Sequence, residues 1–412
     1  MDIRLKEHFE FAAAKTLRAV DALPTRSNQH EIGGLVEAGL GRALGPSAEQ
    51  KKTELQCKMF RLTDSEETPI CVDTQVTWYN TRAGNEKRGP EYRLYYRDNA
   101  VTECLNEGDF MLVALRPNKD LVICFCPQGS PVEWQLRDLF GLNKTGDSKF
   151  HSSELNSRTL LVTVQMCLEE MGIIFAQEGD EDKLLLEQLL EISPNGFPAS
   201  RVLSNLARER VARTSLDNSD QVLMEWLAQE EMLFRVLERH IVRKRLKEGF
   251  GLNFDDVDEF ISYSLSVHNR RKSRVGYAFE NHLEVAFVEN GLRYEKGGKF
   301  NVTENNSKPD FLFPHFRAYH DPLYPINSLF MLAAKTTCKD RWRQVLAEAE
   351  RLKEKYLVTL QPGVSINQIQ EMKYHNLQLV VPEPLINVYP PEVRGDLITL
   401  QSFINHVRRT QV

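Results

Sequence analysis

Two carboxylates and one lysine, far apart along the chain, are the residue types that metal-assisted phosphodiester hydrolysis requires. Asp310 opens the apolar run in KPDFLFP, Lys335 ends the apolar run LFMLAAK, and Glu348 lies on the amphipathic segment that follows. Carboxylate oxygens bind a hard divalent cation, which stabilises charge on the scissile phosphate and acidifies a water, and a lysine orients that water. If the three side chains share one pocket, they predict hydrolysis of a phosphodiester.

The sequence around these residues also predicts the strands that would position them. The runs after Asp310 and before Lys335 are short and apolar, as in buried strands, so a carboxylate and an ammonium would lie at strand ends facing one pocket. A structural interpretation competes with this one, because Pro-Asp often begins a strand and a lysine at a strand end is usually solvated. Glu348 and the polar block KTTCKDRWRQ (335–344) favour hydrolysis over that alternative.

Composition limits the class of protein. A chain of 412 residues predicts two domains, and 42% apolar with 27% charged residues is typical of a globular protein. There is no run of about eighteen apolar residues and no signal-peptide pattern, so we expect a cytoplasmic protein without a membrane segment. The seven cysteines include no CxxC pair, which agrees with a reducing compartment and predicts no zinc site.

The distribution of charge bears on nucleic-acid binding. A net charge of −6 argues against a protein that coats DNA non-specifically. Specific binding depends on local clusters, and basic residues gather at 239–247 and 270–274, whereas acidic residues gather at 178–191. Either cluster alone could also lie on an exposed surface helix. The separation of basic from acidic residues is therefore compatible with a face that binds phosphates but does not require one.

Periodicity divides the chain into a β-rich first part and a mixed α/β second part. Residues 1–20 predict an amphipathic helix, and five alternating runs between 55 and 127 predict an all-β, barrel-like domain. Cys124 and Cys126 are expected to face the same way on its last strand. A polar stretch at 143–157 is the expected boundary.

The second part is expected to form a mixed α/β core. Its predicted helices cover 159–173, 180–192, 217–246, 255–267, 276–290, 340–355, 365–375 and 395–408, with a basic turn at 269–274. Its predicted strands are LRYEKG, FLF, LFMLAAK, YLVTL and LQLVV.

Several segments of the second part closely resemble the catalytic domain of the EcoRII restriction endonuclease family. They are NRRKSRVGYAFENHLE (269–284), KPDFLFP, AYHD (318–321), KTTCKDRWRQ, VTLQPGVS and LVVPE. The first part resembles the family's effector domain more weakly, through NQHEIGG (28–34), TWYNTRAGNEKRG (77–89) and the strands VALR and VICFCP. The resemblance implies a restriction-endonuclease-like α/β core of the PD-(D/E)xK type, with a mixed sheet flanked by helices, preceded by an all-β DNA-binding pseudobarrel.

The same resemblance implies an organisation and an activity. Residues 1–145 correspond to the effector domain, 146–158 to a linker, and 159–412 to the catalytic domain with its helical first part. A type IIE member is a homodimer that cuts double-stranded DNA with Mg²⁺ at short CC/GG sites, such as CCWGG. Its effector domain binds a further copy of the site, and also covers and restrains the catalytic cleft until effector DNA binds. A DNA methyltransferase is expected in the host, though not as a stable partner.

Residue by residue, the resemblance places Asp310, Lys335 and Glu348 on the family's catalytic positions. It adds Glu280 as a further carboxylate on a helix and Tyr319 as an assisting tyrosine. Asp310, Glu348 and Glu280 are therefore expected to bind Mg²⁺, and Lys335 to orient the water. An exposed helix position explains Glu280 equally well.

Two positions depart from the pattern of related nucleases. The acidic residue that usually stands two positions before the lysine is here Ala333, and the family instead uses a carboxylate from the next helix, where Glu348 stands. The family's pocket for a flipped central base is made by an arginine and an aromatic residue, and this chain has Trp226 and Glu230 at the matching positions. The middle position of the recognition site therefore stays open.

The turn KDRWR directly after the lysine is expected to enter the major groove. Lys339 and Arg341 can donate to guanine O6 and N7, and Asp340 can accept from cytosine N4. Arg343 adds a further basic contact. The alternative is a helix N-terminus with an aspartate on its dipole. In the effector domain two polar arms are expected to grip a groove, and they consist of Asn28, Gln29, His30, Arg82, Asn85, Glu86, Lys87 and Arg88.

Two alternatives to a type II restriction endonuclease stay open at the level of sequence. A non-catalytic DNA-binding regulator would use the barrel-like first part, and Asp310 would have no role in its activity. A nuclease that responds to modified DNA would keep the same three residues and differ in whether it cuts methylated substrates.

Overall fold

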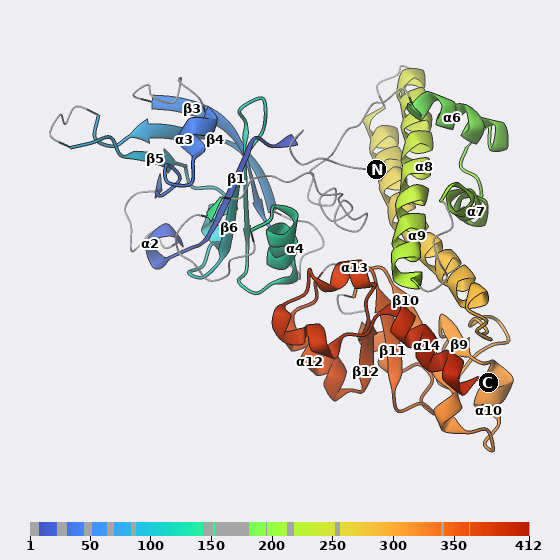
Figure 1. The fold of residues 1–412 in the computed structure, drawn as a ribbon. Helices are drawn as coiled ribbons and strands as arrows, with labels where there is room; N and C mark the ends of the chain where they lie inside the picture. The colour runs from blue at the N-terminus through green and yellow to red at the C-terminus, as the bar shows by residue number, and fades with distance from the viewer. Residues whose placement is uncertain are drawn as a thin grey trace. The chain divides into compact units, whose positions relative to one another are not determined.

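The computed structural model describes most of the chain as two compact units. The described residues are 8–22, 31–44, 52–63, 70–83, 88–142, 151–152, 181–194, 196–211, 218–251, 256–338, 342–361 and 363–411. One unit comprises residues 2–175 and 362–365, and the other comprises 176–361 and 366–412. Each unit has its own sheet (Figure 1). The boundaries of the linker expected at 146–158 stay a prediction, because most of that segment lies outside the described residues.

The first unit is built on an eight-stranded sheet with the order β2-β5-β4-β3-β7-β6-β1-β8. All neighbouring strands are antiparallel except β3 and β7, which are parallel. The strands are β1 (Phe11–Thr16), β2 (Glu31–Ile32), β3 (Lys52–Arg61), β4 (Ile70–Asn80), β5 (Tyr92–Tyr95), β6 (Phe110–Leu115), β7 (Leu121–Cys126) and β8 (His151–Ser152). The helices are α2 (Ala19–Ala22), α3 (Leu40–Leu44) and α4 (Pro131–Leu139). The five predicted strand runs are thus confirmed as β3 to β7.

The first strand corrects one expectation. A helix was predicted over residues 1–20, but Phe11–Thr16 form β1, which pairs with β6. Ala12 and Ala14 pack into one core beside α4, and Phe11 and Ala13 pack into the core on the other face of the sheet. A strand that is buried on both faces carries no polar alternation, and its run of alanines is also typical of a helix. Cys124 and Cys126 lie in the same core, as predicted.

The second unit begins with long helices. They are α6 (Glu181–Ile192), α7 (Ser200–Arg210), α8 (Ser219–Glu248) and α9 (Val257–Glu289), and the shorter helices are α10 (Phe316–His320), α11 (Trp342–Leu346), α12 (Ile366–Tyr374), α13 (Glu383–Ile386) and α14 (Leu400–Thr410). Gly249 caps α8 with a positive φ of 73°. The helix predicted over 159–173 lies outside the described residues. No helix in the described part of the chain is both long and apolar enough to cross a bilayer.

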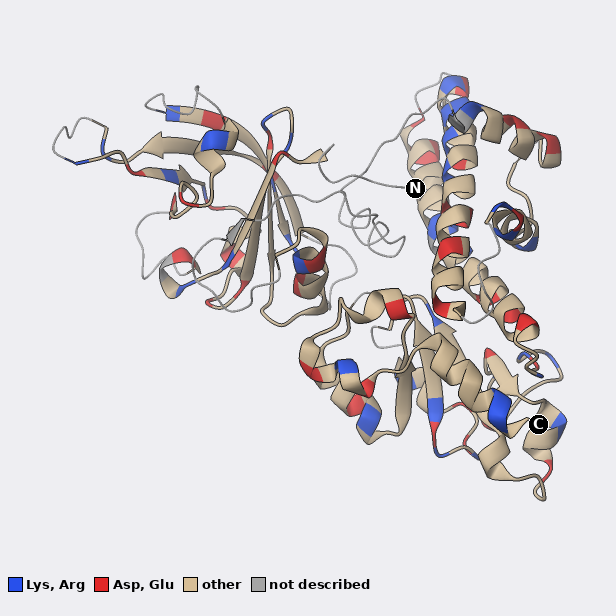
Figure 2. Ribbon diagram, in the orientation of Figure 1, with Lys and Arg blue, Asp and Glu red and all other residues tan. Residues whose placement is uncertain are grey.

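Helix α9 is continuous where the sequence predicted two helices and a basic turn. The turn was expected at 269–274, but these residues lie inside α9. Arg271 forms an ion pair with Glu238 of α8 at 2.7 Å, and Arg274 forms one with Glu231 of α8. Figure 2 shows charges of both signs along the two helices. The basic cluster is therefore partly neutralised between α8 and α9 instead of forming a free positive face.

The sheet of the second unit has the order β12-β11-β10-β9. Its strands are β9 (Phe311–Phe313), β10 (Phe330–Lys335), β11 (Lys355–Thr359) and β12 (Leu377–Val380). β9 is antiparallel to β10, and β10, β11 and β12 are parallel. The strand predicted at LRYEKG is absent from the described structure except for a single bridge between Glu295 and Leu312. The helix predicted over 340–355 is also wrong, because α11 ends at Leu346.

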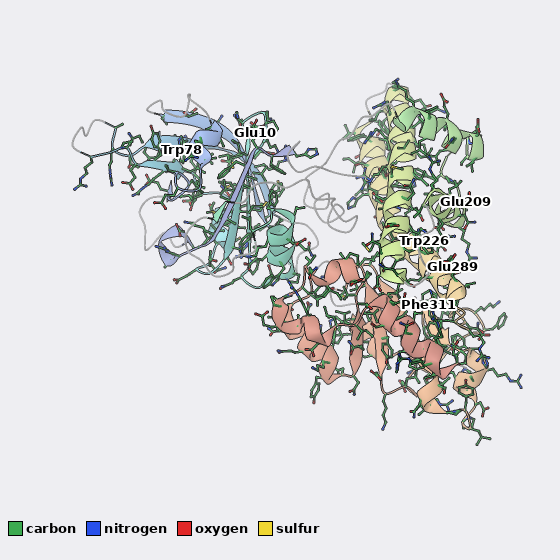
Figure 3. All side chains as sticks on the ribbon, in the orientation of Figure 1. Glu10, Trp78, Glu209, Trp226, Glu289 and Phe311 are labelled. Carbon is green, nitrogen blue, oxygen red and sulfur yellow. The ribbon has the colours of Figure 1, made fainter. Side chains whose placement is uncertain are left out.

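The two faces of this sheet differ in chemistry. Phe311, Leu332 and Tyr356 lie in register on one face. There Phe287 of α9 packs on Phe311 with ring centroids 5.1 Å apart, and Phe403 of α14 packs on Tyr356 at 5.0 Å (Figure 3 labels Phe311). Successive side chains of a strand alternate between faces, so the neighbours of these residues point the other way. That opposite face carries the polar residues described next.

Candidate active site

Asp310 and Lys335 meet at one end of the sheet. Asp310 directly precedes β9 and Lys335 ends β10, and the antiparallel pairing of these strands brings both to the same end. Lys335 Nζ donates to Asp310 Oδ2 at 2.8 Å, and the backbone N–H of Ala334 donates to the same oxygen at 2.8 Å. The Lys335 side chain is 25% exposed and the Asp310 side chain is 19% exposed, so the pair remains open to solvent. Within the described residues no donor is bonded to Oδ1 of Asp310.

Glu348 joins this pair from outside any helix or strand. It lies two residues beyond α11, in a turn and not on the helix expected for it. Burial and, to a smaller extent, the nearby charge of Asp310 raise the pKa of Glu348 from 4.5 to about 7, although Lys335 and Lys355 favour its charged form. Asp310 and Lys335 thus contact each other, and Glu348 lies near enough to both for their charges to affect its pKa.

The free oxygens of these carboxylates have the chemistry of a cation site. Oε2 of Glu348 is buried and has no hydrogen-bond partner among the described residues. A buried carboxylate oxygen without a donor is costly, and a divalent cation would satisfy it. No group of three or more His, Cys, Asp or Glu side chains in the described ranges is placed to hold a metal. The site therefore offers two carboxylates, as is common for Mg²⁺, which keeps several waters or phosphate oxygens as its other ligands.

The other two residues assigned to catalysis have structural partners. Glu280 of α9 accepts from Lys296 Nζ at 2.7 Å, and within the described chain no hydrogen bond or ion pair joins Glu280 to Asp310 or Glu348. Its role as a metal ligand stays a prediction. Tyr319 of α10 is buried, and its hydroxyl donates to Glu304 at 2.5 Å. Burial and this bond raise the pKa of Tyr319 well above its ordinary value.

One charged residue near the site was not predicted. Lys355 begins β11 and is buried, and its Nζ donates to the carbonyl oxygen of Leu346, the last residue of α11. Burial lowers the pKa of Lys355, while Glu348 favours its charged form. A lysine directly before an apolar strand is the only signal that the sequence gives for it.

The residues expected to read bases are only partly described. Lys339, Asp340 and Arg341 lie outside the described residues. Arg343 lies on α11, is half exposed, and forms an ion pair with Glu371 at 3.1 Å. Its contact with DNA stays a prediction.

The positions matched to a base-flipping pocket lie in the helical layer. Trp226 of α8 is buried, and its ring lies 5.6 Å from that of His282 (Figure 3). Glu230 is fully buried and lies 2.9 Å from His282. Burial lowers the pKa of His282. Trp226 is therefore a core residue, as its place in the apolar stripe of this helix indicates.

The effector arms predicted in the first unit are likewise partly described. Arg82 forms an ion pair with Glu91 at 2.5 Å, and Arg88 is exposed. The remaining predicted arm residues fall outside the described residues, and they are Asn28, Gln29, His30, Asn85, Glu86 and Lys87.

A groove lies on the sheet of the first unit, near Arg82. Its volume is about 600 Å³, and it is lined mainly by polar residues of β3, β4 and β5 or residues close to them. They are Lys52, Glu54, Thr74, Gln75, Thr77, Tyr79, Asn80, Ala83, Tyr95 and Arg97. Amide, hydroxyl and guanidinium groups on one concave face can donate to and accept from a polar partner.

The chain is similar in sequence to known restriction enzymes. The family model described as EcoRII C terminal matches residues 234–404. The type II restriction enzyme EcoRII of Escherichia coli is 45% identical over 208 residues, which are 50% of this chain and 50% of that enzyme. The type II restriction enzyme SsoII of Shigella sonnei is 26% identical over 167 residues, 37% of this chain and 53% of that enzyme.

The chain is also similar to solved structures. Metal-depleted Ecl18kI in complex with uncleaved, modified DNA is similar with a TM-score of 0.45 and 17% identity, over 56% of this chain and 84% of that one. The chain spans about half the length of the curated relatives it matches. The family match, by contrast, covers the whole site. Residues 234–404, which include Asp310, Lys335 and Glu348, match the EcoRII C-terminal family model, and the resemblance to the EcoRII family is confirmed.

Proposed function

We propose that the protein is a type II restriction endonuclease that hydrolyses phosphodiesters of double-stranded DNA at a specific site with Mg²⁺. The observation that carries this proposal is the convergence of Asp310, Lys335 and Glu348 at one end of the sheet, where the buried Oε2 of Glu348 has no hydrogen-bond partner among the described residues. The match to EcoRII, a type II restriction enzyme, supports the same activity.

Asp310 and Glu348 would hold the metal ion. Both ligands are hard oxygens, which suit Mg²⁺ and not a soft transition metal. Bound there, Mg²⁺ would stabilise charge on the scissile phosphate and acidify a water. Glu280 is retained as a candidate for a second cation, and Tyr319 as a candidate assisting residue.

Lys335 is the positively charged side chain that would act on the water and the phosphate. Its ammonium has three donors, and one of them is engaged by Asp310, so the others can orient the attacking water and the phosphate oxygen. Asp310 in turn fixes Lys335 through the bond at 2.8 Å and is itself fixed by the backbone N–H of Ala334. Donors that are already in place lose little free energy to reorganisation as charge develops on the phosphorane.

Recognition of a short CC/GG site belongs to the same proposal. Lys339, Asp340 and Arg341 lie four to six residues after Lys335 in the sequence, and their side-chain chemistry matches guanine and cytosine edges in the major groove. The enzyme would act as a homodimer, because a two-fold symmetric site presents the same edges to two copies. A DNA methyltransferase would protect the host genome.

The first unit would bind effector DNA as a pseudobarrel domain. The polar groove over β3, β4 and β5 supports this role, since its side chains could contact base edges and phosphates. The domain would also restrain cleavage until it is occupied.

Purified protein incubated with Mg²⁺ and plasmid DNA tests the proposal. Discrete fragments with defined ends are expected, and EDTA should abolish them. Gel shifts without cleavage would instead favour the DNA-binding regulator. A comparison of methylated and unmethylated plasmids separates an ordinary restriction enzyme from a nuclease that responds to modified DNA.

Restraint by the effector domain predicts a gain of activity on truncation. Deleting residues 1–145 should raise the rate at which the protein cuts DNA that carries one copy of the site. The rate is measured with a short duplex under single-turnover conditions. The same truncation with Lys335→Met serves as control and must be inactive. An unchanged or lower rate in the active truncation would contradict restraint.

Metal binding should compete with protonation of Glu348. Because the pKa of Glu348 is about 7, a cation that binds below this pH must displace about one proton, and affinity should fall as pH decreases from 7. Calorimetric titration of Mn²⁺ in two buffers of different ionisation enthalpy measures the protons released. Release should be near one at pH 6 and vanish at pH 8 and in Glu348→Gln. A pH-independent affinity would contradict the assignment.

A further inference from the structure

Glu348 needs support from elsewhere in the fold, because it lies in no regular element. The turn Glu348–Arg351 follows α11, and Ala349 within it has a φ of 49° although it carries a Cβ. This left-handed conformation is unfavourable for a residue other than glycine. Surrounding contacts must therefore hold the turn, and with it the carboxylate that faces Asp310.

Three side chains accept hydrogen bonds from three successive backbone N–H groups of this turn. The N–H of Ala349 donates to Thr303 Oγ1 at 3.2 Å. The N–H of Glu350 donates to Glu304 Oε2 at 3.1 Å. The N–H of Arg351 donates to the hydroxyl of Tyr319 at 3.2 Å. We call Thr303, Glu304 and Tyr319 the clasp.

The members of the clasp are buried or bonded to one another. Thr303 and Tyr319 are 5% and 1% exposed, and Tyr319 donates to the same oxygen of Glu304 that accepts from the turn. Burial disfavours the charge of Glu304, but the hydrogen bonds outweigh burial and lower its pKa. Glu304 is therefore an ionised acceptor, and its bonds are of the stronger, charge-assisted kind.

Arg351 also joins the turn to α10 and to the residues that follow α10. The guanidinium of Arg351 donates to the carbonyl oxygens of Asp321 at 2.8 Å and Tyr324 at 2.9 Å, and also to that of Tyr319. Lys355 holds the carbonyl of Leu346, just before the turn. Both flanks of Glu348 are thus fixed by residues from other elements.

We propose that Thr303, Glu304 and Tyr319 are positioning residues that hold the Glu348 carboxylate at the cation site through hydrogen bonds to residues 349–351. This inference deepens the proposed function and rests on it. It gives Tyr319 a role that differs from direct assistance in catalysis, since its hydroxyl is already committed to Glu304 and to the turn. It also assigns a role to Glu304 and Thr303.

The test compares Tyr319→Phe, Glu304→Gln and their double variant in the full-length protein. Tyr319→Phe keeps the buried ring and removes the hydroxyl, and Glu304→Gln keeps the shape and removes the charge. Each single variant should weaken Mn²⁺ binding by about 10-fold to 100-fold and raise the Mg²⁺ concentration needed for half-maximal cleavage. The double variant should weaken Mn²⁺ binding by less than the product of the two single fold-changes, because both changes break one network.

Tyr294→Phe is the matched control, since its ring packs on Phe311 and Phe313 on the opposite face of the sheet. Hydrogen exchange in the metal-free protein provides a readout that needs neither metal nor activity. The amides of residues 349–351 should exchange faster in both clasp variants and at the wild-type rate in the control.

The outcomes separate the clasp from the proposed function. Unchanged exchange and unchanged Mn²⁺ affinity in both variants would overturn the clasp while leaving the nuclease intact. A lower rate at saturating Mg²⁺ with unaltered Mn²⁺ affinity would overturn it in favour of direct catalysis by the phenol. A wild-type protein that neither binds Mn²⁺ nor cuts DNA would overturn the proposed function, and with it the role of the clasp.

Discussion

Lys335→Met should reduce DNA cleavage by about 1,000-fold while leaving DNA and metal binding in place. The methionine fills the space of the lysine stem but removes the only ammonium bonded to Asp310 within the described residues. The attacking water and the phosphorane then lose their positively charged neighbour. Asp310 and Glu348 keep their oxygens, so Mn²⁺ should bind at least as well, because a repelling charge has been removed.

Single-turnover cleavage, Mn²⁺ titration and gel shifts in Ca²⁺ measure these three properties separately. Lys373→Met is the matched control, because Lys373 is exposed on α12 and pairs with Asp396, away from the site residues named here. It should cut at the wild-type rate. A Lys335→Met protein that cuts within tenfold of wild type would exclude the assigned role of Lys335 in catalysis.

Glu348→Gln should have two opposite effects. It removes a metal-binding oxygen, so cleavage should fall by about 100-fold to 1,000-fold and Mn²⁺ affinity should fall with it. In the metal-free protein at pH 8, however, the same change should raise the free energy of unfolding by about 3 kcal/mol. An amide removes the buried negative charge that stands beside Asp310.

The sign of the stability change follows from the raised pKa. The folded state keeps a proton on Glu348 up to about pH 7, whereas the unfolded chain loses it near 4.5. The free energy of unfolding therefore decreases as pH rises through this interval and stays low above it. Thermal melts in EDTA should show Glu348→Gln more stable than wild type at pH 8 and equal to it at pH 4. Asp396→Asn, a partly exposed control, should show no such gain in stability. A Glu348→Gln protein that is less stable at pH 8 would contradict the assignment.

The part of the site that sequence could predict is the part that stands on regular strands. Asp310 and Lys335 adjoin short apolar runs that form β9 and β10, and both runs were predicted as strands. Because side chains alternate along a strand, the sequence also predicts on which face of the sheet each one lies. That the two strands pair antiparallel, and thus bring both residues to one end, became visible only in the fold.

Glu348 shows where local sequence fails. RWRQVLAEAERLKEK is rich in helix formers, so propensity predicts a helix through Glu348. The helix ends at Leu346 because the following amides are bound by Thr303, Glu304 and Tyr319, which lie far away in the sequence. Long-range hydrogen bonds outweigh propensity here, and no window around Glu348 contains them.

Two other elements were mispredicted for a related reason. The sequence predicts a turn at the basic segment 269–274, but arginine is a good helix former, and Arg271 and Arg274 find carboxylate partners on α8. An alanine-rich run predicts a helix at β1, but neighbouring strands and two cores, absent from the local sequence, decide its state. In both cases the deciding partner comes from another element.

The bonds from Thr303 and Glu304 to the turn after α11 also carry an evolutionary consequence. Residues 303–304 and 349–351 are separated along the chain, yet an insertion or deletion in one segment would leave donors or acceptors unmatched in the other. Among relatives we therefore expect the two segments to covary in length and residue type, as paired columns of an alignment. A substitution in either segment, although outside the strands that carry Asp310 and Lys335, would then alter the active site.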